Sequence, residues 1–110
     1  MANTFKRAVL ANIDAALVPV YTVPTTTPAT TSVVIGLTLA NVSGASITAS
    51  AQVVTSGDDT YIIKNIPIPS GSSVEIMAGN KIVLEATDVL KVSGSAVNSV
   101  DATMSYMEIS

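Results

Sequence analysis

Residues 32–54, SVVIGLTLANVSGASITASAQVV, contain the pattern that decides the fold class. Apolar residues occupy every second position in both halves of this stretch, and the NVSGAS segment at 41–46 has the composition of a short hairpin turn. Because side chains alternate between the two faces of a strand, the stretch predicts two half-buried strands joined by a turn. The residues expected on the buried faces are Val33, Ile35, Leu37 and Leu39 in the first strand and Ile47, Ala49, Ala51 and Val53 in the second.

The same alternation recurs towards the C-terminus, interrupted by turn segments at 55–60, 69–73, 78–80 and 93–95. Gly71 and Gly79 are expected to be turn glycines, because glycine tolerates positive φ. Strands that recur about every 8–12 residues are typical of an all-β protein, here an antiparallel β-sandwich that could be of jelly-roll type. The further residues expected to share buried faces are Ile62, Ile66 and Ile68, then Leu90 and Val92, then Val100, Ala102, Met104 and Tyr106.

Pro67 and Pro69 lie in a run that otherwise has the pattern of a strand. Proline has no backbone N–H to donate to a neighbouring strand. We therefore expect this strand to end here, to lie at a sheet edge, or to contain a bulge.

Residues 1–17 allow two interpretations, and residues 18–110 are expected to form a single β-sandwich domain. An amphipathic helix of about three turns would place four apolar residues on one face. Two short strands around Asp14-Ala15, or an extended arm, are the alternative, which we favour because the following VPVYTVP segment is extended. The residues at helical spacing are Phe5, Val9, Ile13 and Leu17.

The composition favours a protein that works in contact with copies or partners. Charged residues make up 12% of the 110 residues, about half of the usual share of roughly 25%, so part of the surface is expected to be covered. The net charge is −3, and the only adjacent cations are Lys6 and Arg7, so no basic patch for nucleic acid is expected. No apolar run approaches the ~18 residues that a membrane helix needs.

Catalytic chemistry has little support in this sequence. The chain has no His, Cys or Trp, which removes the commonest general base and most ligands of transition metals. Asp58 and Asp59 are the only adjacent carboxylates, and their position between two strands favours a solvated turn over a calcium site. We therefore expect no catalytic residues, no metal site, no cofactor and no enzymatic activity.

Several short segments between residues 18 and 110 form a recognisable set. They are Tyr21-Thr22-Val23-Pro24, Ala40-Asn41, Ile66-Pro67-Ile68-Pro69-x-Gly71-Ser72-Ser73, Lys81-Ile82-Val83-Leu84-Glu85 followed by Asp88, and Ser105-x-Met107-Glu108-Ile109. Together these segments resemble small virion structural proteins of tailed bacteriophages. Thr87 departs from the pattern, since related sequences often have Gly before the Asp.

The resemblance implies a β-sandwich that works in many copies on a virion. A capsid decoration (cement) protein is favoured, as a trimer that contacts the major capsid protein. The alternative within the virion is a neck or tail component, such as a head-tail connector or fibre protein. A receptor- or glycan-binding module is the alternative of another class, but it would need clustered exposed aromatic side chains, and the chain has only four aromatic residues.

The contacts of such a protein are expected in three segments. An arm at residues 1–17 could add a strand to the sheet of a neighbour. The other two segments are candidate sheet edges or contact ridges. The candidate interface residues are Phe5, Val9, Ile13, Tyr21, Val23, Pro24, Ile66, Pro67, Ile68 and Pro69.

Overall fold

The computed structural model describes residues 3–24, 30–77 and 81–109 of the chain. These residues contain nine strands and no helix, and therefore no helix that could cross a membrane. The strands are β1 (Asn3–Ile13), β2 (Val18–Thr22), β3 (Thr31–Asn41), β4 (Ile47–Val54), β5 (Asp59–Ile68), β6 (Ser73–Glu75), β7 (Ile82–Leu84), β8 (Val89–Ser93) and β9 (Val100–Ile109).

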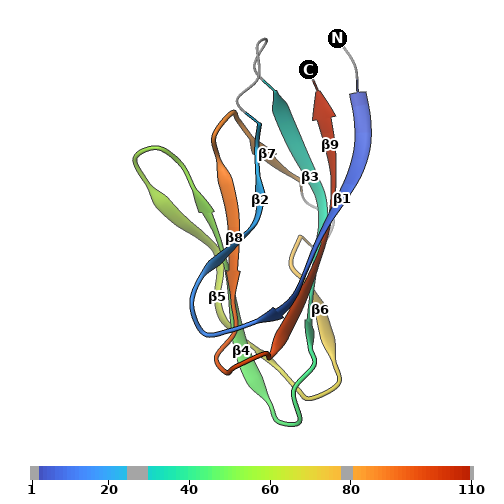
Figure 1. Cartoon of the computed structure of the whole chain (residues 1–110), viewed down its shortest axis with the longest axis vertical. Helices are drawn as coiled ribbons and strands as arrows, with labels where there is room; N and C mark the ends of the chain where they lie inside the picture. The colour runs from blue at the N-terminus through green and yellow to red at the C-terminus, as the bar shows by residue number, and fades with distance from the viewer. Residues whose placement is uncertain (1–2, 25–29, 78–80, 110) are drawn as a thin grey trace.

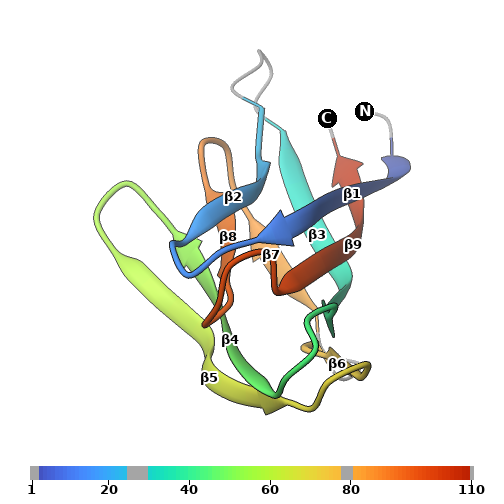
Figure 2. The same ribbon diagram turned by 60° about the horizontal axis from the view of Figure 1, so that its bottom comes forward.

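The strands form two antiparallel sheets that face each other, so the predicted β-sandwich is confirmed (Figure 1). In sheet 1 the order is β1-β9-β3, and the far side of β3 pairs with the short strands β6 and β7. In sheet 2 the order is β2-β8-β4-β5. Figure 2 shows the same two layers from a view in which the loops at the lower end come forward.

The core lies between the two sheets and is built from the alternating side chains of the long strands. Met104 and Leu37 of sheet 1 and Leu90 of sheet 2 are fully buried, as the period of two predicts. The expected inward residues of β8 and β9 are all buried, and so are the first three of β4. Val53, the fourth, is only half-buried.

A β-bulge corrects the prediction for β3. Tyr106 lies opposite Val34 and Ser105 lies opposite Gly36, so Ile35 is the extra residue that has no partner. Such an insertion reverses the facing of every residue on one side of it. Val34 is therefore buried with Leu37 and Leu39, whereas Val33 and Ile35 lie outside the core, contrary to the expectation from simple alternation.

β5 is an edge strand and ends before Pro69, as its prolines predict. Asn65 has φ 55°, and the pairing with β4 shifts register beside it. Because of this shift Ile63, and not Lys64, lies opposite the buried Ala51. The pairing shifts again at Ile62, which has no partner in β4. Ile62 and Ile66 pack against the core, as predicted, and Ile63 packs there as well.

Residues 3–13 form a strand that pairs along its length with β9, so the helical interpretation of this segment is wrong. The residues at helical spacing do not share one face. Phe5 and Val9 are exposed, whereas Ile13 is buried in the core. A shift of register at Asn12, which has φ 58°, brings Ile13 inward. β1 is thus an edge strand of sheet 1.

Turns separate consecutive strands at 42–46, 55–58 and 69–72, within the predicted ranges 41–46, 55–60 and 69–73, whose remaining residues belong to the adjoining strands. Gly71 has φ 75°, which confirms it as a turn glycine. Gly79, the other predicted turn glycine, lies outside the described residues.

Candidate interaction surface

The outward face of sheet 1 carries exposed apolar side chains near the start of β1 and the end of β9, which lie side by side at one end of the sandwich (Figure 1). Along β1 the side chains of Ala8 and Leu10 pack against the core, so those of Phe5, Arg7 and Val9 point away from it. Phe5 is 74% exposed and Val9 is 64% exposed. Two large apolar side chains on one edge strand are thus open to solvent.

The register extends this exposed surface into a row that crosses four strands. Phe5 pairs with Met107 of β9, and Met107 also pairs with Val33 of β3. Val33 in turn pairs with Val83 of β7, which is 61% exposed. We call Phe5, Met107, Val33 and Val83 the apolar row. The solvated face of an antiparallel sheet is usually polar, so four apolar residues in line indicate a contact surface.

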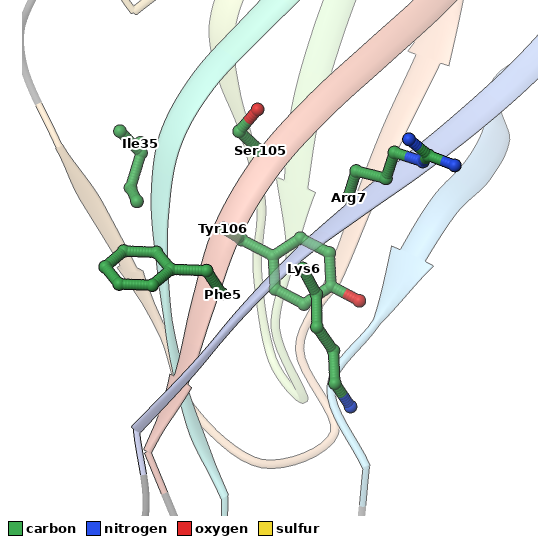
Figure 3. Close-up of a pocket in the computed structure, with 6 residues that line it drawn as sticks. All are labelled: Phe5, Lys6, Arg7, Ile35, Ser105 and Tyr106. Atoms are coloured by element: carbon green, nitrogen blue, oxygen red, sulfur yellow. The ribbon is translucent and has the colours of Figure 1, made fainter.

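A shallow groove of about 510 Å³ lies beside the apolar row (Figure 3). The bulge in β3 supplies one of its walls, because it turns Ile35 away from the core. The groove has apolar and cationic parts and opens widely to solvent. Its lining residues are Phe5, Lys6, Arg7, Ile35, Ser105 and Tyr106.

A polar cluster joins the two sheets at the same end of the sandwich. Lys6 Nζ lies 2.7 Å from Glu108 Oε1, and the hydroxyl of Tyr21 donates to Glu108 Oε2 at 2.7 Å. The Tyr21 hydroxyl also lies 2.7 Å from Ser32 Oγ. The ring of Tyr21 packs on that of Tyr106, with 4.2 Å between the centroids. Tyr21 belongs to sheet 2 and its partners to sheet 1, so the cluster ties the layers together.

This environment changes the acidity of each titratable member. Hydrogen bonds from Lys6 and Tyr21 lower the pKa of Glu108, because they stabilise the carboxylate. The hydrogen bond to Glu108 raises the pKa of Lys6. Burial raises the pKa of Tyr21 and of Tyr106, so both phenols remain neutral at physiological pH. The cluster therefore holds a carboxylate and an ammonium as a pair, which favours a structural role.

The structure divides the ten predicted interface residues into three groups. Three lie inside the core and have no side chain to offer a partner: Ile13, Val23 and Ile68. Two belong to the apolar surface of β1: Phe5 and Val9. The remaining five are half-buried or exposed, with Tyr21 in the polar cluster and the rest near the ends of edge strands: Tyr21, Pro24, Ile66, Pro67 and Pro69.

Sequence reasoning missed most of the apolar row. Val33 was expected to face the core, and Val83 belongs to a strand of only three residues. Met104 is buried and Met107, three residues later on the opposite face of β9, points outward. The spacing of these two methionines was the available sequence signal for an apolar outer face.

Within the described residues, no group of three or more acidic side chains is arranged to hold a metal ion. Every described buried side-chain nitrogen or oxygen atom has a hydrogen-bond partner. The buried side-chain polar atoms of the described residues are therefore all satisfied within the fold.

No protein-family model matches the chain, and no curated protein matches its sequence. Solved structures share its fold at low identity. One is from the disulfide-linked pili of Bacillus endospore appendages, with TM-score 0.58 at 12% identity over 98% of this chain and 88% of that chain. Another is from the acid-stable capsid of Helicobacter pylori bacteriophage KHP30, with TM-score 0.53 at 10% identity over 100% and 94%.

A third similar structure comes from the T13 viral particle of IBDV, with TM-score 0.58 at 8% identity over 96% of this chain. The chain spans only 30% of the length of that viral protein. At these identities the similarity concerns the β-sandwich fold alone.

Proposed function

We propose that this protein is a structural component of a phage virion, and that it works as a capsid decoration (cement) protein. The observation that carries the proposal is the apolar row on the outward face of sheet 1. A surface of this kind stabilises contacts by burying apolar area, and it needs no catalytic or metal-binding side chain. Its partners are other virion proteins, the major capsid protein first, and its location is the virion.

The similarity to a phage capsid chain and to a viral particle chain supports a role in assembly, because those proteins share this fold. A homo-oligomer, with a trimer favoured, would match the threefold positions that a capsid lattice offers. A neck or tail location is the alternative within the virion. The similarity to pili of Bacillus endospore appendages favours one further candidate, a subunit of an extracellular fibre.

A receptor- or glycan-binding module has less support. Among the described aromatic residues, Phe5 and Tyr61 are exposed, but Phe5 belongs to sheet 1 and Tyr61 to the far edge of sheet 2. Tyr21 and Tyr106 are held in the polar cluster. A binding platform for sugars or bases would need several rings together.

The test is to count this protein in purified particles by quantitative mass spectrometry, relative to the major capsid protein. A decoration protein is present in a fixed ratio to the major capsid protein across the shell. A neck or tail component is present in the few copies of a single ring. Absence from particles would overturn the virion proposal, and recovery in surface fibres would favour the fibre candidate.

A second arm of the experiment addresses the surface itself. Shells that lack the protein are mixed with a variant that carries Phe5→Ser and Val83→Ser, and bound protein is measured by co-sedimentation. We expect binding to weaken by at least about tenfold, since two exposed apolar anchors of the row are lost. A variant with Val42→Ser and Val97→Ser, which changes two exposed valines outside the row, is the matched control.

A further inference from the structure

Most of the free sheet edges in this molecule carry features that prevent pairing with another strand. β2 has five residues, includes Pro19 and shifts register beside it. β6 and β7 have three residues each. The second half of β5 contains Asn65 in a left-handed conformation and then Pro67. Short length, bulges and proline are the usual ways in which proteins block such edges.

β1 lacks this protection along most of its length, and β5 lacks it over its first three residues. β1 has 11 residues without proline and pairs only with β9, and its register is regular from Asn3 to Leu10. In β5, residues 59–61 pair with β4 in regular register and on one side only, and they precede the register shift at Ile62, the left-handed Asn65 and Pro67. An unprotected edge presents a row of backbone donors and acceptors that another strand can use.

The side chains on these two edges are complementary in charge. Arg7 is exposed on the outward face of β1, and the one ion pair of the described residues uses its neighbour Lys6 instead. At the start of β5, Asp58 and Asp59 are exposed, and neither carboxylate pairs with a described cation. Figures 1 and 2 both place β1 and the β4–β5 hairpin on opposite sides of the molecule.

The facing of the side chains matches as well. Tyr61 pairs with Gln52, which pairs with Lys91 between the buried Leu90 and Val92, so Tyr61 points outward from sheet 2. Asp59, two residues away on the same strand, points outward too. An antiparallel pair that sets Phe5 opposite Tyr61 also sets Arg7 opposite Asp59, because the residue numbers then run in opposite directions.

We propose that β1 of one copy of this chain pairs antiparallel with residues 59–61 of β5 in a second copy, with Arg7 beside Asp59 and Phe5 beside Tyr61. The joined sheets would continue the apolar row with the tyrosine of the neighbour. Because the two edges lie on opposite sides, each copy keeps one edge of each kind free. The contact is head-to-tail, so it forms a ring if the rotation closes and an open chain if it does not.

The proposal concerns contacts between copies and holds for a virion protein or a fibre subunit alike. It is tested by cross-linking, because the chain contains no cysteine. Phe5→Cys and Tyr61→Cys variants are oxidised separately and as an equimolar mixture, and dimers are measured on a non-reducing gel. Paired positions in a β-ladder are close enough for a disulfide. Val97→Cys, at an exposed position between β8 and β9, measures the level of disulfides that form by random collision.

We expect the mixture to form disulfide-linked dimers well above the level of the Val97→Cys control, and each single variant alone to remain at that level. Dimers of Phe5→Cys alone would show a symmetric β1–β1 contact and would overturn the proposal. Dimers of Tyr61→Cys alone would do the same by showing a β5–β5 contact. A mixture that stays at the control level would also overturn it.

Charge reversal tests the register independently. Arg7→Asp and Asp59→Arg should each weaken association by about tenfold or more in analytical ultracentrifugation, because each sets like charges opposite one another. The variant with both substitutions should regain most of that association. If the double variant associates as poorly as the single variants, Arg7 does not lie beside Asp59 and the proposed pairing is overturned.

Discussion

At the scale of single residues, Thr87 shows how a local conformation can be required against the preference of the side chain. Thr87 has φ 75°, a left-handed conformation that suits glycine and disfavours β-branched residues. The turn is held in place by its surroundings: Asp88 Oδ2 accepts from the Glu85 N–H at 2.9 Å, and the Thr87 N–H donates to the Val23 carbonyl at 3.3 Å. The backbone contacts therefore outweigh the strain at Thr87.

We expect Thr87→Gly to stabilise the protein by about 0.5–1 kcal/mol. Glycine removes the strain of about 1–2 kcal/mol and costs about 0.5–1 kcal/mol of additional chain entropy. Urea denaturation with a constant m-value measures the difference. Gly71→Ala is the matched control with the opposite sign, because Gly71 has the same φ of 75° and no atom stands near an added Cβ. Destabilisation by Thr87→Gly would show that this turn has another conformation.

Glu108 makes the stability depend on pH. Its folded-state pKa lies below the ordinary value of 4.5, so the unfolded chain binds a proton more readily than the folded chain. The contribution of Glu108 is thus present above the unfolded pKa and is lost as the pH falls through the folded pKa. Glu108→Gln should therefore destabilise the protein most above about pH 5 and least near about pH 3.

The measurement for Glu108 is thermal unfolding of both proteins between those two pH values. Glu85→Gln is the control, since the side chain of Glu85 is exposed and makes no hydrogen bond with the described residues. An equal loss at both pH values would mean that the carboxylate charge of Glu108 does not contribute. A loss of stability in Glu85→Gln with the same pH dependence as in Glu108→Gln would assign the effect to net charge.

At the scale of the elements, the period of two predicted the strands well but could not locate the bulges. The inward sets of β8 and β9 follow directly from alternation, because no residue is inserted there. In β3 the single extra residue Ile35 reverses the facing of Val33, and nothing in the letters SVVIGLTL marks where the insertion falls. For that reason the apolar row could not be predicted. It depends on the register of β1, β9, β3 and β7, which are not consecutive in the sequence.

The N-terminal strand illustrates the same limit. The letters of residues 3–13 fit a helix and a strand, and only pairing with β9 decides between them. Burial of Ile13, with Ala8 and Leu10 packed on the core, shows what β1 contributes to the fold.

We expect deletion of residues 2–17 to destabilise the fold. The deletion uncovers one side of β9 and removes Ile13 from the core, where loss of such a side chain costs about 2–5 kcal/mol. Circular dichroism and thermal unfolding give the result, with Phe5→Ser as a control that changes β1 at an exposed position only. A truncated chain with unchanged stability would show that residues 1–17 are a separate arm.

At the scale of the whole molecule, the sandwich buries as much surface as an independent domain does. Its accessible surface of 5814 Å² is close to the roughly 5,700 Å² expected for a monomer of this mass. The monomer therefore needs no neighbour to complete its core, although its proportion of charged residues is low. The exposed apolar row and the two open edges are additional surface that a folded monomer can offer.

This separation of folding from association predicts how stability depends on concentration. We expect the Arg7→Asp variant to associate weakly, so its Tm should be the same at protein concentrations of about 1 and about 100 μM. In the unmodified chain Tm should rise over that range, because association stabilises only the folded state. Differential scanning calorimetry at the two concentrations measures both values. A variant that unfolds at low concentration would show instead that neighbouring copies complete the fold, and a constant Tm in both proteins would place association outside this range.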